Sequence, residues 1–133
     1  PRTTARVIDL ANQGFYNGQR FHKVVRSPKP FLVQGGDPNS KTKAPGDASL
    51  GSYSSGTKIP FEKTSLRHVR GAVGFARLDN DRNSGDTQFY ILLDTYAFLD
   101  GQYTVFGNVV EGLDLLDSIQ LGDRLTKATI VLK

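Results

Sequence analysis

The segment Phe31-Leu32-Val33-Gln34-Gly35-Gly36-Asp37-Pro38 decides how this chain is interpreted, because an apolar run takes up a glutamine and then stops. The two-residue period of a β-strand places Leu32 and Gln34 on one face. The glycine pair that follows ends the strand with a turn that tolerates positive φ. An apolar side chain beside an amide on one open face predicts a surface that holds an extended peptide.

The rest of the chain predicts two helices and many short strands. A helix is expected over residues 1–12, because Val7, Leu10 and Ala11 share one face and Gly14 follows its end. A second helix is expected over residues 111–119. We expect strands over residues 20–25, 31–35, 72–76, 88–93, 103–110 and 125–132, and an exposed loop over residues 39–57. This pattern favours a mostly β chain folded as a closed antiparallel β-barrel capped by two α-helices.

Composition sets wider limits on the chain. Its 133 residues predict one domain, and 14 Gly with 6 Pro fit a loop-rich β protein. No apolar run reaches membrane-spanning length. The absence of Cys excludes disulfides, thiol catalysis and Cys-based zinc sites, and leaves the cellular compartment unknown. A net charge of +4 with scattered Lys and Arg gives nucleic-acid binding no support.

Five blocks of sequence carry a family resemblance. In chain order they are residues 18–25, 31–38, 71–76, 84–90 and 98–107, and they span most of the chain. In this order they resemble the cyclophilin-type peptidyl-prolyl cis-trans isomerases, and Phe98 and Tyr103 resemble the bacterial or organellar branch. The family's barrel has two strands before its first helix, and none precede residue 1 here. We therefore expect an omitted N-terminal segment, or strands from elsewhere that cover the open edge.

The resemblance implies an enzyme that accelerates rotation about X-Pro peptide bonds in proline-containing peptides or unfolded proteins. The barrier to this rotation is about 18–20 kcal/mol. A catalyst must favour the twisted state, in which the imide nitrogen becomes pyramidal and accepts a hydrogen bond. An apolar pocket for the proline ring, a cation near that nitrogen and an amide on the preceding carbonyl suffice. No cofactor and no metal are expected.

The resemblance also assigns site residues. Gln34 would hold the substrate backbone, Ala76 would pair with it through its main chain, and Gln88 would support the site. The residues expected to line the proline pocket are Phe31, Leu32, Tyr90 and Leu99, with Phe98 and Tyr103 at its rim. Aromatic and aliphatic residues at strand spacing are by default core residues, so the pocket assignment depends on the ordered blocks.

The cation is where the chain departs from the family, which has Arg directly after the Phe-His pair. Here that position is Lys23, which keeps the charge but lacks the planar guanidinium. A longer connection to Phe31 also contains Arg26, a second candidate. Period-two alternation puts Lys23 and Arg26 on opposite faces. We favour Lys23 by alignment and interpret Arg26 as a solvated loop charge.

Other polar residues receive a structural interpretation. His22 is expected to be a hydrogen-bonded structural residue, because bond rotation needs no general base. His68 is expected to lie in a loop. The aspartates Asp79, Asp81 and Asp86 offer a weak cation site as one interpretation, and we favour the other, that they are solvated loop residues.

A second functional class stays open at this point. The chain is interpreted first as an isomerase that aids folding, and alternatively as a catalytically weak proline-binding chaperone or assembly module on the same scaffold. A nucleic-acid-binding barrel would need stacking aromatics interleaved with cations on one surface. The resemblance further implies cyclosporin binding, with reduced affinity because Phe98 lacks the indole N–H of a rim Trp.

Overall fold

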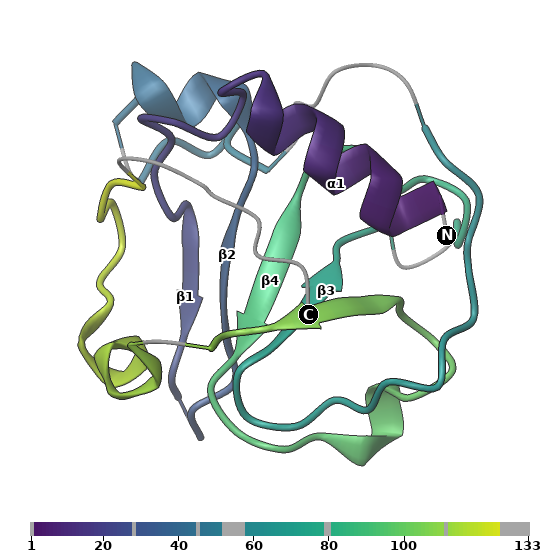
Figure 1. The fold of residues 1–133 in the computed structure, drawn as a ribbon. Helices are drawn as coiled ribbons and strands as arrows, with labels where there is room; N and C mark the ends of the chain where they lie inside the picture. Colours follow the sequence, from purple (N-terminus) through teal and green to yellow (C-terminus); the bar gives the residue numbers. More distant parts are fainter. Residues whose placement is uncertain are drawn as a thin grey trace.

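The computed structural model describes residues 2–27, 29–44, 46–51, 58–78, 81–110 and 112–125. One sheet of five antiparallel strands organises them, in the order β1-β2-β4-β3-β5, and helix α1 lies across it (Figure 1). The strands are β1 (Lys23–Val25), β2 (Leu32–Gly35), β3 (Ala72–Phe75), β4 (Phe89–Leu92) and β5 (Val105–Asn108). The helical segments are α1 (Arg2–Asn12) and the 3₁₀ turns η1 (Pro38–Lys41), η2 (Ala97–Leu99) and η3 (Leu113–Ser118).

The register places Tyr90 at the centre of the sheet. On β4 it stands opposite Gln34 of β2 on one side and Gly74 of β3 on the other. Gln34 in turn stands opposite Lys23 of β1. Directly opposed residues of antiparallel strands point to the same face, so these four positions form one row across the sheet.

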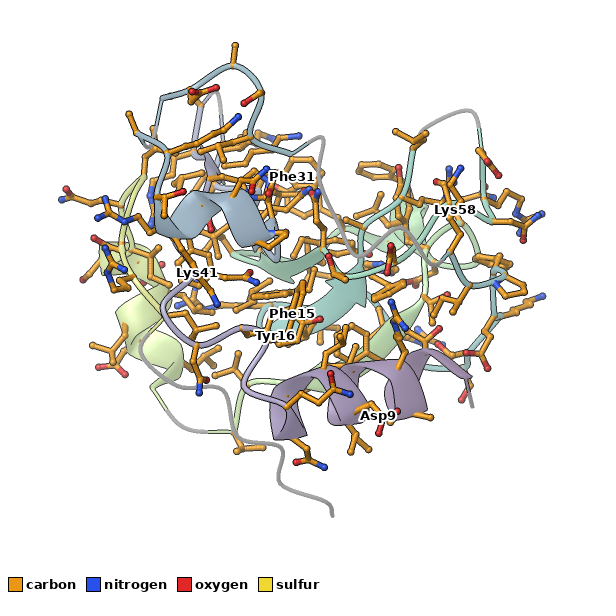
Figure 2. The ribbon with its side chains drawn as sticks, turned by 90° about the horizontal axis from the view of Figure 1, so that it is seen from above. Asp9, Phe15, Tyr16, Phe31, Lys41 and Lys58 are labelled. Carbon is orange, nitrogen blue, oxygen red and sulfur yellow. The ribbon has the colours of Figure 1, made fainter. Side chains whose placement is uncertain are left out.

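The two faces of the sheet carry different clusters. Val7, Leu10 and Ala11 of α1 pack with Tyr16 and Phe75 on one face. In Figure 2, Tyr16 lies between α1 and the strands, whereas Phe31 lies on the far side of the strands from α1. The cluster on that far side contains Leu32, Ala72, Tyr90, Leu92, Leu99 and Val105. The predicted pocket residues therefore share the face that α1 leaves uncovered.

The predicted antiparallel β fold with an amphipathic first helix is confirmed. The second helical segment also lies where it was expected, but it is a six-residue 3₁₀ helix and not an α-helix. Gly112 precedes it in the left-handed conformation at φ 77°, with no side-chain cap. The bond from Leu115 N to Gly112 O spans three residues, and only Leu116 of this segment is buried. One apolar anchor gives too little burial to extend the turn into a longer helix.

The strand predicted over residues 20–25 is shorter than expected. His22 N still donates to Gln34 O at 3.0 Å, but residues 18–21 pair with the segment near residue 124. There Gly18 N donates to Leu125 O and Leu125 N to Gln19 O, each at 2.6 Å. Residues 126–132 of the strand predicted at the C-terminal end lie outside the described residues.

The loop predicted over residues 39–57 is less exposed at its start than expected. Pro38–Lys41 forms η1, in which Ser40 is fully buried and its hydroxyl accepts from Arg20 N at 2.9 Å. The buried Asp37 carboxylate accepts from Asn39 N at 2.9 Å and from Gly51 N at 2.7 Å. Side-chain bonds to backbone amides thus fold this loop onto the end of β2. No helix in the described part of the chain is long and apolar enough to cross a membrane.

Replacement of Gly36 by Ala should destabilise the fold. Gly36 has φ +104°, and an added Cβ would lie 2.5 Å from Gln88 Cα and from Thr87 O. Left-handed strain and the clash together predict a loss of about 2–4 kcal/mol. Chemical denaturation measures it, with Gly46→Ala as the control, because a Cβ at Gly46 meets nothing within 4 Å. Equal stability of the two variants would contradict this account of the turn.

Candidate functional site

Tyr90 is the centre of the uncovered face. Its side chain is only 4% exposed, and its ring covers Gly74 so closely that a Cβ there would lie 2.1 Å from Tyr90 Cζ. The phenolic oxygen contacts His68 Nε2 at 2.7 Å. Burial raises the pKa of Tyr90, so its hydroxyl stays protonated. The ring therefore belongs to a buried apolar cluster, and its only polar atom is already bonded.

Aromatic groups surround Tyr90 on this face. Tyr103 packs edge-on against it at 6.0 Å between centroids, and the Arg77 guanidinium lies 4.2 Å from the centre of the Tyr103 ring. Phe31 packs edge-on against Tyr96 at 4.9 Å. Most of the predicted pocket residues thus meet in one cluster: Leu32, Tyr90 and Leu99 are buried, and Phe31 and Tyr103 are partly buried against them.

Phe98 differs from the other predicted rim residues. It is 70% exposed, and it contacts Tyr96 edge-on at 6.0 Å. It lies on η2 directly before the buried Leu99. An aromatic ring that is exposed beside an apolar cluster suits the rim of a binding surface.

A pair of amides borders the aromatic cluster. Gln34 Nε2 donates to Gln88 Oε1 at 3.2 Å, and Gln88 Nε2 donates to Gly51 O at 2.8 Å. Ala76 N donates to Gln88 O at 2.9 Å. The amide of Gln34 is therefore oriented by Gln88, and the backbone N–H of Ala76 is already bonded to Gln88 O.

The two candidate cations occupy different environments. Lys23 is exposed and stands opposite Gln34, on the face of the aromatic cluster. Arg26 lies just beyond the end of β1 and its Nη2 donates to Leu116 O at 2.9 Å and Ile119 O at 2.6 Å. The interpretation of Arg26 as a solvated charge is therefore wrong. Its guanidinium satisfies carbonyls at the end of η3.

A cavity of about 490 Å³ lies beside Arg26, away from Tyr90. It is lined by Val24, Val25, Arg26, Ser27, Ile119, Gln120 and Leu121. Of the predicted site residues only Arg26 borders it. We place the candidate site on the Tyr90 face, because the amides, the rings and Lys23 meet there.

The two histidines compare differently with what was expected from the sequence. His68 lies in a loop, as expected, but it is 1% exposed and is bonded to Tyr90 and to Asp100, which was not expected. The hydroxyl of Tyr90 could have indicated a buried partner such as His68, since a buried phenol needs a hydrogen-bond partner. Among the described residues neither ring nitrogen of His22 has a hydrogen-bond partner, which corrects the interpretation of that histidine. Burial lowers the pKa of His22.

Carboxylates do not gather into a metal centre in the described ranges, where no three His, Asp or Glu side chains are placed to hold an ion. Asp86 is not solvated, because it accepts from Arg6 Nη2 at 2.6 Å and is 5% exposed. This partly buried ion pair ties α1 to the segment before β4. Asp79 lies outside the described residues.

The structure is a β-sheet domain with a lysine, an amide and an aromatic ring in one row across one face of the sheet, and further aromatic rings around them. The chain was compared with known proteins to find the family that has this fold. The family model for cyclophilin type peptidyl-prolyl cis-trans isomerases matches residues 1–132. A probable peptidyl-prolyl cis-trans isomerase of Brucella abortus is 38% identical over 98% of this chain and 71% of its own length.

Further relatives agree with this match. A peptidyl-prolyl cis-trans isomerase of Synechococcus elongatus is 34% identical over 98% of this chain and 82% of its own length. A crystal structure of a Cryptosporidium parvum cyclophilin type peptidyl-prolyl cis-trans isomerase, in the presence of the dipeptide Ala-Pro, superposes with a TM-score of 0.73. That structure is 26% identical, over 90% of this chain and 71% of its own.

The chain belongs to the family of cyclophilin-type peptidyl-prolyl cis-trans isomerases. The predicted family is confirmed, and with it the predicted class of enzyme, an isomerase of X-Pro peptide bonds. The assignment to a bacterial or organellar branch and the absence of two strands before α1 stay predictions.

Asp100 should titrate below its ordinary pKa of 3.8. Its carboxylate accepts hydrogen bonds from the His68 backbone N–H, which has the larger effect, and from the His68 side chain. Both bonds lower the pKa of Asp100. A lowered native pKa means that Asp100 stabilises the fold above pH 3.8, and that this stabilisation is lost as the pH falls through the native pKa. A carboxyl-carbon NMR titration measures the midpoint, which should rise in His68→Phe. A midpoint at or above 3.8 in the unsubstituted protein would contradict the hydrogen-bond assignment.

Proposed function

We propose that this protein isomerises X-Pro peptide bonds on the Tyr90 face, with Lys23 as the cation. The observation that carries the proposal is the row formed by Lys23, Gln34 and Tyr90 on three neighbouring strands. Adjacent strands lie about 4.8 Å apart, so the row spans roughly 10 Å, the scale of an X-Pro dipeptide. A proline ring at one end and a cation at the other then fit one substrate.

The apolar cluster suits the proline ring. Leu32, Tyr90 and Leu99 form its buried floor, and the phenolic oxygen of Tyr90 is bonded to His68. Phe31, Tyr103 and Phe98 would close the sides and the rim. Burial of a pyrrolidine ring against such surface supplies binding energy without a bond to the substrate.

The polar groups suit the substrate backbone. Gln34, oriented by Gln88, would donate to the carbonyl that precedes the proline. The Ala76 carbonyl oxygen would accept a substrate N–H. An extended substrate held in this way presents its imide bond near Lys23, as peptides bound along a sheet do.

Lys23 would act on the twisted state alone. When the imide bond rotates, resonance is lost and the nitrogen lone pair accepts a hydrogen bond, which the Lys23 ammonium can donate. A bond made only in the transition state lowers the barrier without tightening the ground state. Rotation makes and breaks no covalent bond, so neither a nucleophile nor a general base takes part.

The second candidate function is a proline-binding chaperone with weak catalysis. The exposure of Lys23 favours it, because a flexible ammonium in solvent is less preorganised than a guanidinium fork. Exchange NMR on an Ala-Pro peptide separates the two, since it reports binding and cis-trans interconversion independently. Binding without faster interconversion would favour the chaperone.

Catalysis should depend on Lys23 and not on Arg26. Lys23→Ala should lower the exchange rate of an Ala-Pro peptide at least about tenfold, because a charge-assisted hydrogen bond contributes about 1.5–3 kcal/mol. Lys23→Arg should raise the rate. Arg26→Ala should leave the rate within about twofold and lower the stability instead, since it removes two bonds to the end of η3. A larger rate loss in Arg26→Ala would reverse the assignment.

Cyclosporin should bind this protein, and an indole at the rim should tighten it. Phe98 is exposed and has no N–H to donate, so Phe98→Trp should gain about one to two decades in affinity. Calorimetric titration measures it. Leu121→Trp is the matched control, because Leu121 is also exposed, at 49%, and lies outside the site. Equal affinities of Phe98→Trp and the unsubstituted protein would refute the rim position of Phe98.

A further inference from the structure

His68 joins the two parts of the chain that form the candidate pocket. Its backbone N donates to Asp100 Oδ1 at 2.7 Å, and its backbone O accepts from Tyr96 N at 2.9 Å. Its ring nitrogens contact Asp100 Oδ1 at 2.8 Å and Tyr90 Oη at 2.7 Å. All four of its polar groups are engaged, and its side chain is almost completely buried.

The carboxylate fixes the direction of these bonds. An ionised Asp100 can only accept, so Nδ1 of His68 carries a proton. In the neutral imidazole Nε2 is then an acceptor, and the Tyr90 hydroxyl donates to it. The chain of bonds runs from the Tyr90 phenol through His68 to Asp100.

The partners of His68 hold opposite sides of the candidate pocket. Tyr90 belongs to β4, whereas Tyr96 and Asp100 flank η2, which carries Phe98 and Leu99. No strand pairing joins η2 to the described sheet, so bonds to His68 are among the contacts that set its position. The His68 ring also lies nearly parallel to the Tyr90 ring, at 15° and 6.0 Å.

Gly74 shows why the orientation of Tyr90 matters. The hydroxyl end of the ring lies over Gly74: a Cβ there would be 2.1 Å from Tyr90 Cζ and 2.2 Å from Tyr90 Oη, so the ring keeps this place because β3 has no side chain at that position. A phenol without an acceptor would turn its hydroxyl toward water or toward the bound proline. A polar atom facing an apolar ligand weakens binding, because it leaves a hydrogen bond unmade.

We propose that His68 is a positioning residue for the isomerase. Held in its Nδ1–H tautomer by Asp100, it withdraws the Tyr90 hydroxyl from the proline-binding surface and fixes η2 beside β4. The inference rests on the proposed function for its effect on catalysis. Its hydrogen-bond geometry stands independently of that function.

A double-mutant cycle tests the coupling. His68→Phe keeps a ring of similar size but leaves the Tyr90 hydroxyl without its acceptor. It should slow Ala-Pro exchange about tenfold in the chain with Tyr90, and about twofold in the Tyr90→Phe chain, where no hydroxyl is left unbonded. Equal losses in both backgrounds would mean that His68 acts by packing alone, and would overturn the proposal.

Nitrogen NMR of the histidine rings supplies a readout that packing alone does not move. In the unsubstituted protein, His68 should show a protonated Nδ1 and an Nε2 that accepts a hydrogen bond. The Nε2 resonance should shift in Tyr90→Phe, while His22, the other of two histidines, should not respond. A protonated Nε2 in neutral His68, or no shift in Tyr90→Phe, would overturn the proposal without any variant at His68.

The two failures are distinguishable. If the unsubstituted protein does not accelerate exchange, the proposed function fails, and the cycle is measured on peptide affinity, where the same tenfold against twofold contrast is expected. If exchange is accelerated but the cycle shows no coupling, only the role of His68 fails. Chemical denaturation of each variant confirms that it is folded under the conditions of the assay.

Discussion

The close approach of Tyr90 to Gly74 is the constraint on which the candidate site depends. The ring occupies the space that a side chain on β3 would need, and this holds β3 and β4 in one register. From this position its hydroxyl contacts His68 Nε2 at 2.7 Å, and its ring packs edge-to-face with the ring of Tyr103. The binding face is thus organised around one residue at the centre of the sheet, with the polar groups on β1 and β2 and the aromatic rim on η2.

The sequence offers two candidates for the catalytic cation, Lys23 and Arg26, and the structure places them in different environments. Lys23 stays exposed beside the amides, whereas Arg26 is bound to carbonyls of η3. Only two residues, Val24 and Val25, separate them, and yet they contact different elements. A lysine with a long flexible stem retains freedom to reach a substrate, and an arginine with several donors suits the fixed carbonyls at a helix end. Arg26, in the connection between β1 and β2, therefore makes a structural contact with η3. Lys23 remains the candidate for the catalytic cation, on the basis of its alignment with the family.

Much of the fold was predictable because its signals are local. The period of Val7, Leu10 and Ala11 predicts α1, and the alternation around Gln34 predicts β2 and the face it presents. The pocket cluster was predictable through the ordered blocks of the resemblance. A local sequence pattern does not show which distant residue a polar side chain will hydrogen-bond. The bonds of His68 to Tyr90 and of Arg26 to Leu116 join residues 22 and 90 positions apart. The 3₁₀ form of η3 was also missed, because the deciding factor was how few of its leucines find a core.

The pairing of residues near Gly18 with those near Arg124 has a consequence for synthesis on the ribosome. These partners are 106 positions apart, so the stretch that leads into β1 acquires its hydrogen bonds only after almost all described residues have been made. Helix α1 and the hairpin of β1 and β2 can form early, but Lys23 sits on an edge strand whose approach is secured last. A nascent chain of this protein would therefore pair Lys23 with Gln34 in the early hairpin, whereas Tyr90 of β4 and Leu99 of η2 would join this face later. The stretch that leads into β1 would be fixed last of all.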